Sequence, residues 1–186
     1  LIIQGHPDPR GGRFGHALAD AYACAAAQAG HEVQRLDIAK LDFALLRTKE
    51  EFDGQPPCEA IQSAQQAMVS AQHLVIFFPL WLGGMPALLK GFLEQALRPG
   101  FAFDLRGSAK QQLKGKSARI VVTMGMPSLV YRWYFGAHGL KSLSRSILGF
   151  CGMGPVRTTL VGNVEGSARG REKWMQRMRG LGAEGG

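Results

Sequence analysis

The sequence predicts an α/β protein in which one mostly parallel sheet is covered by helices on both faces. Short apolar runs alternate along the chain with longer segments whose apolar residues recur at helical spacing. Residues 74–78 are apolar throughout, which is typical of a strand buried on both faces of a parallel sheet. Strands that alternate with helices require right-handed crossovers, and therefore a parallel sheet.

The first half of the chain contains three of the expected strands. Residues 1–3 end a first strand, and residues 14–29 carry apolar side chains at helical spacing until a glycine stops the helix. A second strand alternates through residues 32–38, and residues 41–55 form a long mixed connection. Pro57 then opens a helix that leads to the apolar third strand.

The second half repeats the pattern. A helix begins after Pro86, which stands where proline is tolerated in a first turn, and it presents one apolar stripe until Pro99 ends it. The later elements are expected, in order, at residues 118–123 (strand), 140–150 (helix), 156–161 (strand) and 167–179 (helix).

Length and composition indicate one ordinary globular domain. The 186 residues are 46% hydrophobic and 19% charged, and no apolar run approaches the ~20 residues that span a bilayer. We therefore expect no membrane insertion. The three cysteines lie far apart and form no zinc-binding pattern, so we expect a reducing compartment, the cytoplasm.

The charge restricts the class of ligand. The chain has 22 basic and 14 acidic side chains and a net charge of +8, which suits nucleic acid, an anionic membrane or a phosphorylated small molecule. No nucleic-acid-binding motif accompanies the charge, so we expect no nucleic-acid partner. The sequence also lacks a GxSxG elbow and a cluster of metal ligands, which argues against a hydrolase and against a metal enzyme.

The loops that leave the carboxyl ends of the strands hold the unusual residues, and ligands of such sheets bind at that edge. The first loop, residues 4–14, is rich in glycine and proline, carries Arg10 and Arg13, and runs into a helix. Backbone amides at such a helix start favour a phosphate group. The loop matches neither GxGxxG nor a P-loop, and a simple connecting turn is the alternative.

Two further loops add flat apolar surface. Residues 77–91 place a tryptophan and two glycines between two prolines, and residues 123–138 follow a strand end with glycine, several aromatic residues and a histidine. Together these loops suit a planar ring with polar edges, such as an isoalloxazine. For Trp81, Trp133 and Tyr134, packing in the core is the alternative.

Four motifs, in order, resemble the NAD(P)H:quinone oxidoreductase family of flavodoxin-like flavoproteins. They are His6-Pro-Asp-Pro, Phe77-Phe-Pro-Leu-Trp with Met85-Pro-Ala-Leu-Leu-Lys-Gly-Phe, Pro99-Gly-Phe-Ala-Phe103, and Thr123-Met-Gly with the later tyrosine and histidine. The resemblance covers nearly the whole chain. It implies a three-layer, doubly wound, five-stranded parallel sheet of order 2-1-3-4-5, with residues 1–186 as a single flavin-binding domain.

The resemblance also implies which residues hold the flavin. Gly15 stands where the family usually has asparagine, Gly83 replaces a bulkier residue, and the first loop is longer than usual. Arg169 corresponds to a basic residue on the adenylate side, with an ordinary surface residue of the last helix as the alternative. The implied contacts are His6, Phe14 and Gly15 near the phosphates, Pro79, Leu80, Trp81, Leu82 and Gly83 at the ring, and Thr123, Met124, Gly125 and Met126 at its other edge.

The implied chemistry is a ping-pong hydride transfer from NAD(P)H through the flavin to a quinone or similar acceptor. Tyr131 and His138, the latter one residue further along than usual, would donate a hydrogen bond or a proton to the charge that reduction creates. Phe103 matches a segment that closes the substrate pocket of the opposite subunit, which implies a homodimer. We expect FAD, with FMN as the alternative.

Other functions stay open on this sequence. An electron carrier of the same fold is typically acidic, so the charge of +8 argues against it. Azo- or nitroaromatic reduction would use the same site. A regulatory subunit of a potassium efflux system also resembles this family and would have a binding role.

Overall fold

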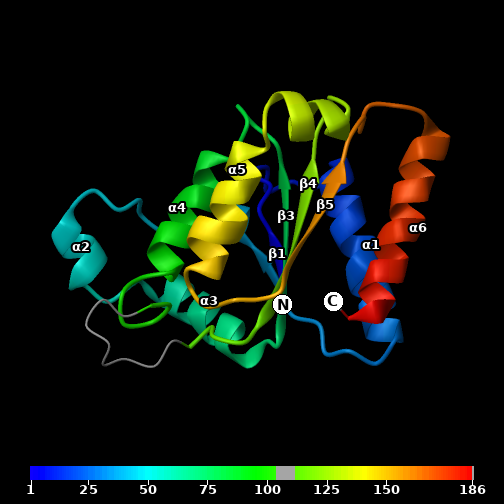
Figure 1. Cartoon of the computed structure of the whole chain (residues 1–186). Coiled ribbons are helices and arrows are strands. Elements are labelled where there is room, and N and C mark those ends of the chain that lie inside the picture. The colour runs from blue at the N-terminus through cyan, green and yellow to red at the C-terminus, as the bar shows by residue number, and fades with distance from the viewer. Residues whose placement is uncertain (104–111, 186) are drawn as a thin grey trace.

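The computed structural model describes residues 1–103 and 112–185, in which five parallel strands form one central sheet (Figure 1). The strand order is β2-β1-β3-β4-β5, which confirms the expected order and fold class. The strands are β1 (Ile2–Gln4), β2 (Arg35–Asp37), β3 (His73–Pro79), β4 (Ser117–Thr123) and β5 (Val156–Val161).

Helices cover both faces of this sheet. In Figure 1, α1 (Phe14–Gln28) and α6 (Ala168–Glu184) lie on one side, and α3 (Glu59–Ser70), α4 (Ala87–Ala96) and α5 (His138–Lys141) lie on the other. Successive residues of β3 therefore enter different cores. Val75 and Phe77 pack with α1 and α6, whereas Ile76 lies in the larger core opposite. Two buried faces explain why this strand is apolar throughout.

Two segments near the sheet edge differ from the prediction. The expected strand 32–38 pairs with β1 only over three residues and then turns into the short 3₁₀ helix η1 (Ile38–Lys40). The expected connection 41–55 contains a short helix, α2 (Lys49–Asp53). Its cap is Thr48, whose hydroxyl accepts a hydrogen bond from the Glu51 amide at 3.2 Å.

The second half of the chain contains wider helical turns than expected. The predicted helix 140–150 begins as α5 and continues as the π-helical segment η3 (Ser142–Gly149). A second π-helical turn, η2 (Val130–Tyr134), lies in the loop after β4. The closing helix, α6, extends beyond its predicted end at Arg179 to Glu184. In the part of the chain that the structure describes, no helix is long and apolar enough to cross a membrane.

Candidate functional site

Three loops meet at the carboxyl edge of the sheet, the upper edge in Figure 1. They follow β1, β3 and β4, which are neighbours in the sheet. Backbone hydrogen bonds tie the first residues of two of these loops to the neighbouring strand: the Gly5 amide donates to the Phe77 carbonyl of β3 at 2.6 Å, and the Leu80 amide donates to the Thr123 carbonyl of β4 at 2.8 Å. The predicted residues of the three loops are therefore brought to one edge.

Residues 81–84 form a tight turn after β3, here named the 81–84 turn. Trp81 and Gly84 exchange two backbone hydrogen bonds of 3.0 Å. The two residues between them have positive φ, 47° at Leu82 and 79° at Gly83. Glycine adopts this conformation easily, but leucine does not. Trp81 is half exposed and Leu82 is fully exposed, so a strained apolar residue is presented to solvent at the tip of the turn.

Two imidazoles stand beside this turn. The ring of His6 lies 6.3 Å from the ring of Trp81 and 4.9 Å from the ring of His16 on α1. The Nδ1 atom of His6 accepts a hydrogen bond from the Asp8 amide at 3.0 Å, which leaves Nε2 to carry the proton. Burial lowers the pKa of His6, and the neighbouring His16 lowers it further, so His6 is neutral near pH 7.

A carboxylate organises the rest of the first loop. Asp8 accepts side-chain hydrogen bonds from Arg10 at 2.9 and 3.0 Å and from Arg13 at 3.2 and 3.0 Å. The bonds from Arg10, and then from Arg13, hold the pKa of Asp8 well below its usual range. These three residues, with His6 and Trp81, help to line a cavity of about 620 Å³.

The buried Gln4 ties the first loop to the start of α1. Its side-chain oxygen accepts a hydrogen bond from the His6 amide at 3.1 Å, and its nitrogen donates to the Gly15 carbonyl at 3.4 Å. Gly15 in turn faces Thr123, since a Cβ there would lie 3.8 Å from Thr123 Oγ1. Sequence reasoning missed Gln4, although a glutamine that ends an apolar strand was the available signal.

The loop after β4 is anchored to the chain that follows β5. The Val164 amide donates to the Met124 carbonyl and the Asn163 amide donates to the Met126 carbonyl, each at 3.2 Å. Met124 is buried, Met126 is half-buried and Gly125 is exposed. The aromatic residues for which core packing was the alternative lie outside the core, since Trp81, Trp133 and Tyr134 are all exposed.

Tyr131 and His138 lie on this same loop in different surroundings. Tyr131 is buried, and its hydroxyl donates to the Gly83 carbonyl at 3.2 Å. Burial raises the pKa of Tyr131. His138 is exposed and is the first residue of α5. The residue after it, Gly139, packs directly on the 81–84 turn. No signal in the sequence singled out Gly139 as a site residue.

Two predicted residues lie outside this cluster. Arg169 is exposed in the first turn of α6. Phe103 is half-buried, and within the described chain its aromatic partners are Phe150 at 4.9 Å and Phe52 at 6.5 Å. The structure thus does not bring Phe103 to the three loops of its own subunit.

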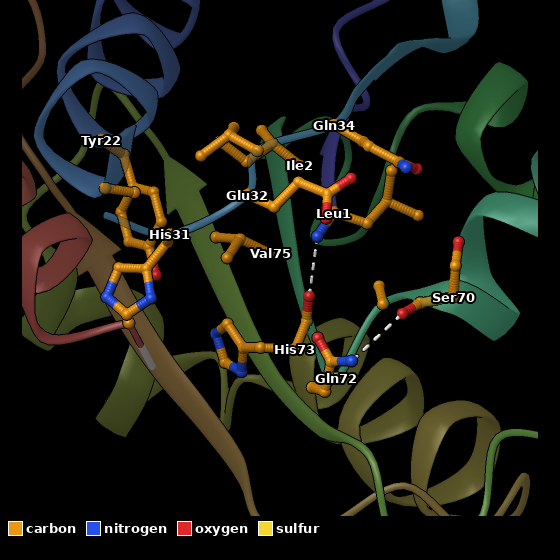
Figure 2. A pocket seen from close by; sticks show the side chains of 14 residues that line it. Leu1, Ile2, Tyr22, His31, Glu32, Gln34, Ser70, Gln72, His73 and Val75 are labelled. Carbon is orange, nitrogen blue, oxygen red and sulfur yellow. Dashed lines mark hydrogen bonds between the residues drawn. The ribbon is translucent and has the colours of Figure 1, made fainter. Parts of the chain in front are cut away.

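A second cavity, of about 230 Å³, lies at the opposite, amino-terminal edge of the sheet (Figure 2). Tyr22, His31 and His73 point towards it from different elements (Figure 2). Of these three residues, His73 belongs to the central sheet. Its ring is half-buried because it starts the central strand β3, and Nδ1 lies 2.7 Å from the Ser117 hydroxyl.

The donors at the carboxyl edge fit a flavin. Among the described residues, none accepts a hydrogen bond from the amides of Leu82 and Gly83, or from those of Phe14 and Gly15 in the first turn of α1. No side chain caps that helix. Unpaired amides beside exposed apolar side chains suit a flat ring with a polar edge, and an uncapped helix start suits a phosphate.

This sheet order and this cluster of strand-end loops define a flavodoxin-like protein. The sequence model of a family described as having the flavodoxin-like fold matches residues 1–181, so the chain belongs to that family. The chain is 30% identical over 173 residues to an uncharacterized NAD(P)H oxidoreductase of Haemophilus influenzae, with 88% of this chain and 83% of that protein covered. It is 29% identical over 209 residues to the rat NAD(P)H dehydrogenase [quinone] 1, with 96% and 75% covered.

Two other comparisons add a cofactor name and a solved fold. An FMN-dependent NADH:quinone oxidoreductase of Ruegeria pomeroyi is 28% identical over 180 residues, with 77% of this chain and 85% of that protein covered. The solved structure of an NAD(P)H:quinone oxidoreductase from Methanothermobacter marburgensis superposes with a TM-score of 0.82 at 22% identity, over 98% of this chain and 92% of that one. The latter supports the fold alone.

Proposed function

We propose that this chain is a flavin-dependent NAD(P)H oxidoreductase that reduces a quinone or a related acceptor by a ping-pong mechanism. Residues 1–186 would form a single flavin-binding domain. The observation that carries the proposal is the 81–84 turn, which presents Trp81, Leu82 and two unpaired amides beside the uncapped start of α1. The relatives named as oxidoreductases support the reaction class.

Either flavin can be tested at this site. The expectation of FAD has no support in the names of the relatives, one of which is FMN-dependent. Both cofactors carry a phosphate that the amides of Phe14 and Gly15 would bind. Arg10 and Arg13, fixed by Asp8, would add positive charge at the cavity that His6 and Trp81 also line. FMN is therefore the first cofactor to try, and FAD the second.

A bound flavin would supply hydride transfer between NAD(P)H and the acceptor. The chain would supply position and charge. The apolar surface of Trp81 and Leu82 would exclude water from one side of the ring, and the amides of the 81–84 turn would hold its polar edge. His138, being exposed, has ring nitrogens available to donate a hydrogen bond or a proton to the charge formed on reduction.

Phe103 and the subunit arrangement complete the proposal. Because Phe103 lies away from the cluster in its own subunit, a contact with substrate requires a second subunit, and we propose a homodimer in which Phe103 closes the partner site. A reducing compartment such as the cytoplasm is part of the same proposal, since two of the three cysteines are exposed as free thiols.

The first experiment is a visible absorption spectrum of the protein mixed with FMN or FAD and then desalted, before and after anaerobic addition of NADPH or NADH. Flavin bands that survive desalting and bleach on addition support the proposal. Bands that survive without bleaching would favour an electron carrier or a regulatory subunit. Retention of neither flavin would contradict the proposal.

A variant pair tests the role of His138. Substitution His138→Ala should slow flavin bleaching about 100-fold if its imidazole assists the reaction. His31→Ala is the matched control, because His31 is also exposed but lies at the opposite edge of the sheet. Equal bleaching rates in the two variants would remove His138 from the mechanism.

A further inference from the structure

The hydroxyl of Tyr131 has a hydrogen-bond acceptor and a hydrogen-bond donor as partners within the protein. The side chain is 1% exposed. Its hydroxyl donates to the Gly83 carbonyl at 3.2 Å and accepts a hydrogen bond from the Leu140 amide, also at 3.2 Å. A phenol has a single proton, and that proton is directed at the 81–84 turn. A ligand at the carboxyl edge would therefore have to compete with Gly83 for it.

The two segments that Tyr131 joins, the 81–84 turn and the start of α5, also pack against each other at Gly139. A Cβ on Gly139 would overlap the Gly83 carbonyl oxygen and would lie 2.7 Å from Gly84 Cα. Only glycine allows the start of α5 to approach the turn this closely. The Leu140 amide lies in the first turn of α5, where amides have no partner inside the helix, and the tyrosine hydroxyl supplies that partner.

The turn needs such a support because its own bonds leave its orientation open. The two hydrogen bonds between Trp81 and Gly84 close the turn on itself. Leu82 at its tip has no packing to hold it, since its side chain is fully exposed. Within the described chain, Tyr131 provides the side-chain hydrogen bond that links this turn to another element.

We propose that Tyr131 is a positioning residue that fixes the 81–84 turn against the start of α5, and thereby sets where the amides of Leu82 and Gly83 meet a ligand. The inference rests on the proposed function for the identity of that ligand, a flavin. It assigns proton donation to the exposed His138 and removes it from Tyr131.

The test compares three variants with the wild type. Tyr131→Phe removes the hydroxyl, and Gly139→Ala keeps the hydroxyl but pushes the turn away from α5. Tyr22→Phe is the control, because Tyr22 is also a buried tyrosine but lines the cavity at the opposite edge. The readouts are amide hydrogen exchange at Leu140 and Gly84 without flavin, the flavin Kd, the thermal midpoint, and the pH profile of the bleaching rate at saturating flavin.

A positioning role predicts a particular pattern. In Tyr131→Phe, the Leu140 amide should exchange at least tenfold faster, and the flavin Kd should rise about tenfold, which is the loss of one or two hydrogen bonds. Gly139→Ala should raise the Kd similarly. In both variants the bleaching rate at saturating flavin should stay within threefold of the wild type, with an unchanged pH profile. Tyr22→Phe should leave the Kd unchanged.

The opposite pattern overturns the inference. An unchanged Kd with a bleaching rate that falls 100-fold, or loses a limb of its pH profile, would identify Tyr131 as a catalytic residue. An unchanged exchange rate of the Leu140 amide in Tyr131→Phe would show that the hydroxyl does not fix the 81–84 turn against the start of α5. If the wild type itself binds no flavin, the proposed function fails, whereas hydrogen exchange still decides whether Tyr131 fixes the turn.

Discussion

Gly180 and Gly182 lie two residues apart on α6 and have opposite surroundings, which allows a sharp prediction. A Cβ on Gly182 would overlap the carbonyl oxygen of Tyr22 on α1, and would lie 3.1 Å from the carbonyl carbon and Cα of Tyr22. A Cβ on Gly180 would meet nothing within 4 Å. Substitution of each glycine by alanine therefore adds the same methyl group to the same helix, once into solvent and once into backbone.

The expected free energies have opposite sign. Alanine is favoured over glycine inside a helix by about 0.8–1 kcal/mol, so Gly180→Ala should stabilise the fold by somewhat less than that near the helix end. At Gly182 the obstacle is backbone, which cannot rotate away, and overpacking of this kind costs about 1–3 kcal/mol. The net effect of Gly182→Ala should be a loss of about 1–2 kcal/mol.

Urea unfolding and the thermal midpoint provide the assay. In a protein of this size about 1 kcal/mol shifts the thermal midpoint by about 2–4 °C. The midpoint of Gly180→Ala should therefore lie about 2 °C above that of the wild type, and the midpoint of Gly182→Ala about 3–6 °C below it. Equal stabilisation by both substitutions would mean that α1 and α6 do not meet at Gly182. The packing of α1, which carries Phe14 and Gly15 at its other end, would then need another explanation.

Three further predictions follow from single residues. Leu82→Asn creates an Asn-Gly pair suited to the positive φ values of the turn, so it should stabilise the fold by about 1 kcal/mol in thermal unfolding while weakening flavin binding. Burial lowers the pKa of His73 to about 4 from its ordinary 6.5, so the folded state binds fewer protons than the unfolded state between those values. The urea midpoint should fall with pH from about 6.5 to about 4, and should fall less in His73→Gln. Burial raises the pKa of Cys151 to about 11, so a thiol reagent should label two cysteines quickly and the third only on unfolding.

Much of the fold was readable from the sequence because the signals were strong and local. The uninterrupted apolar run of β3, the stripe of α4 and the alternation of elements predicted the sheet and its layers. The helix α2 was missed because it is short, and only the spacing of Thr48 and Glu51 signalled it. The length of strand β2 was overestimated because an edge strand pairs on one side only, so its alternating sequence pattern covers more residues than its hydrogen bonds do.

The candidate site was predictable as an edge of the sheet but not as a set of contacts. Residues at the carboxyl ends of adjacent strands must be neighbours, which placed His6, Trp81 and Thr123 together in advance. The engagement of the Tyr131 hydroxyl depends on how closely Gly139 approaches the turn, and that distance is a property of packing. The role of Gln4 likewise depends on folding, because the His6 amide and the Gly15 carbonyl that its side chain binds come together only when the first loop folds back to α1.

The ring contact between His6 and Trp81 gives this molecule an optical reporter at the candidate site. The chain has three tryptophans; Trp133 is exposed on the loop after β4, and Trp174 lies on α6 with the Arg177 guanidinium 5.5 Å from its ring centroid. Replacing these two by phenylalanine leaves Trp81 as the single indole. Its emission would be quenched when the imidazole 6.3 Å away gains a proton, or when a flavin ring takes up its excitation energy. One fluorescence titration would then follow both the ionisation of His6 and the arrival of a cofactor, with no added label.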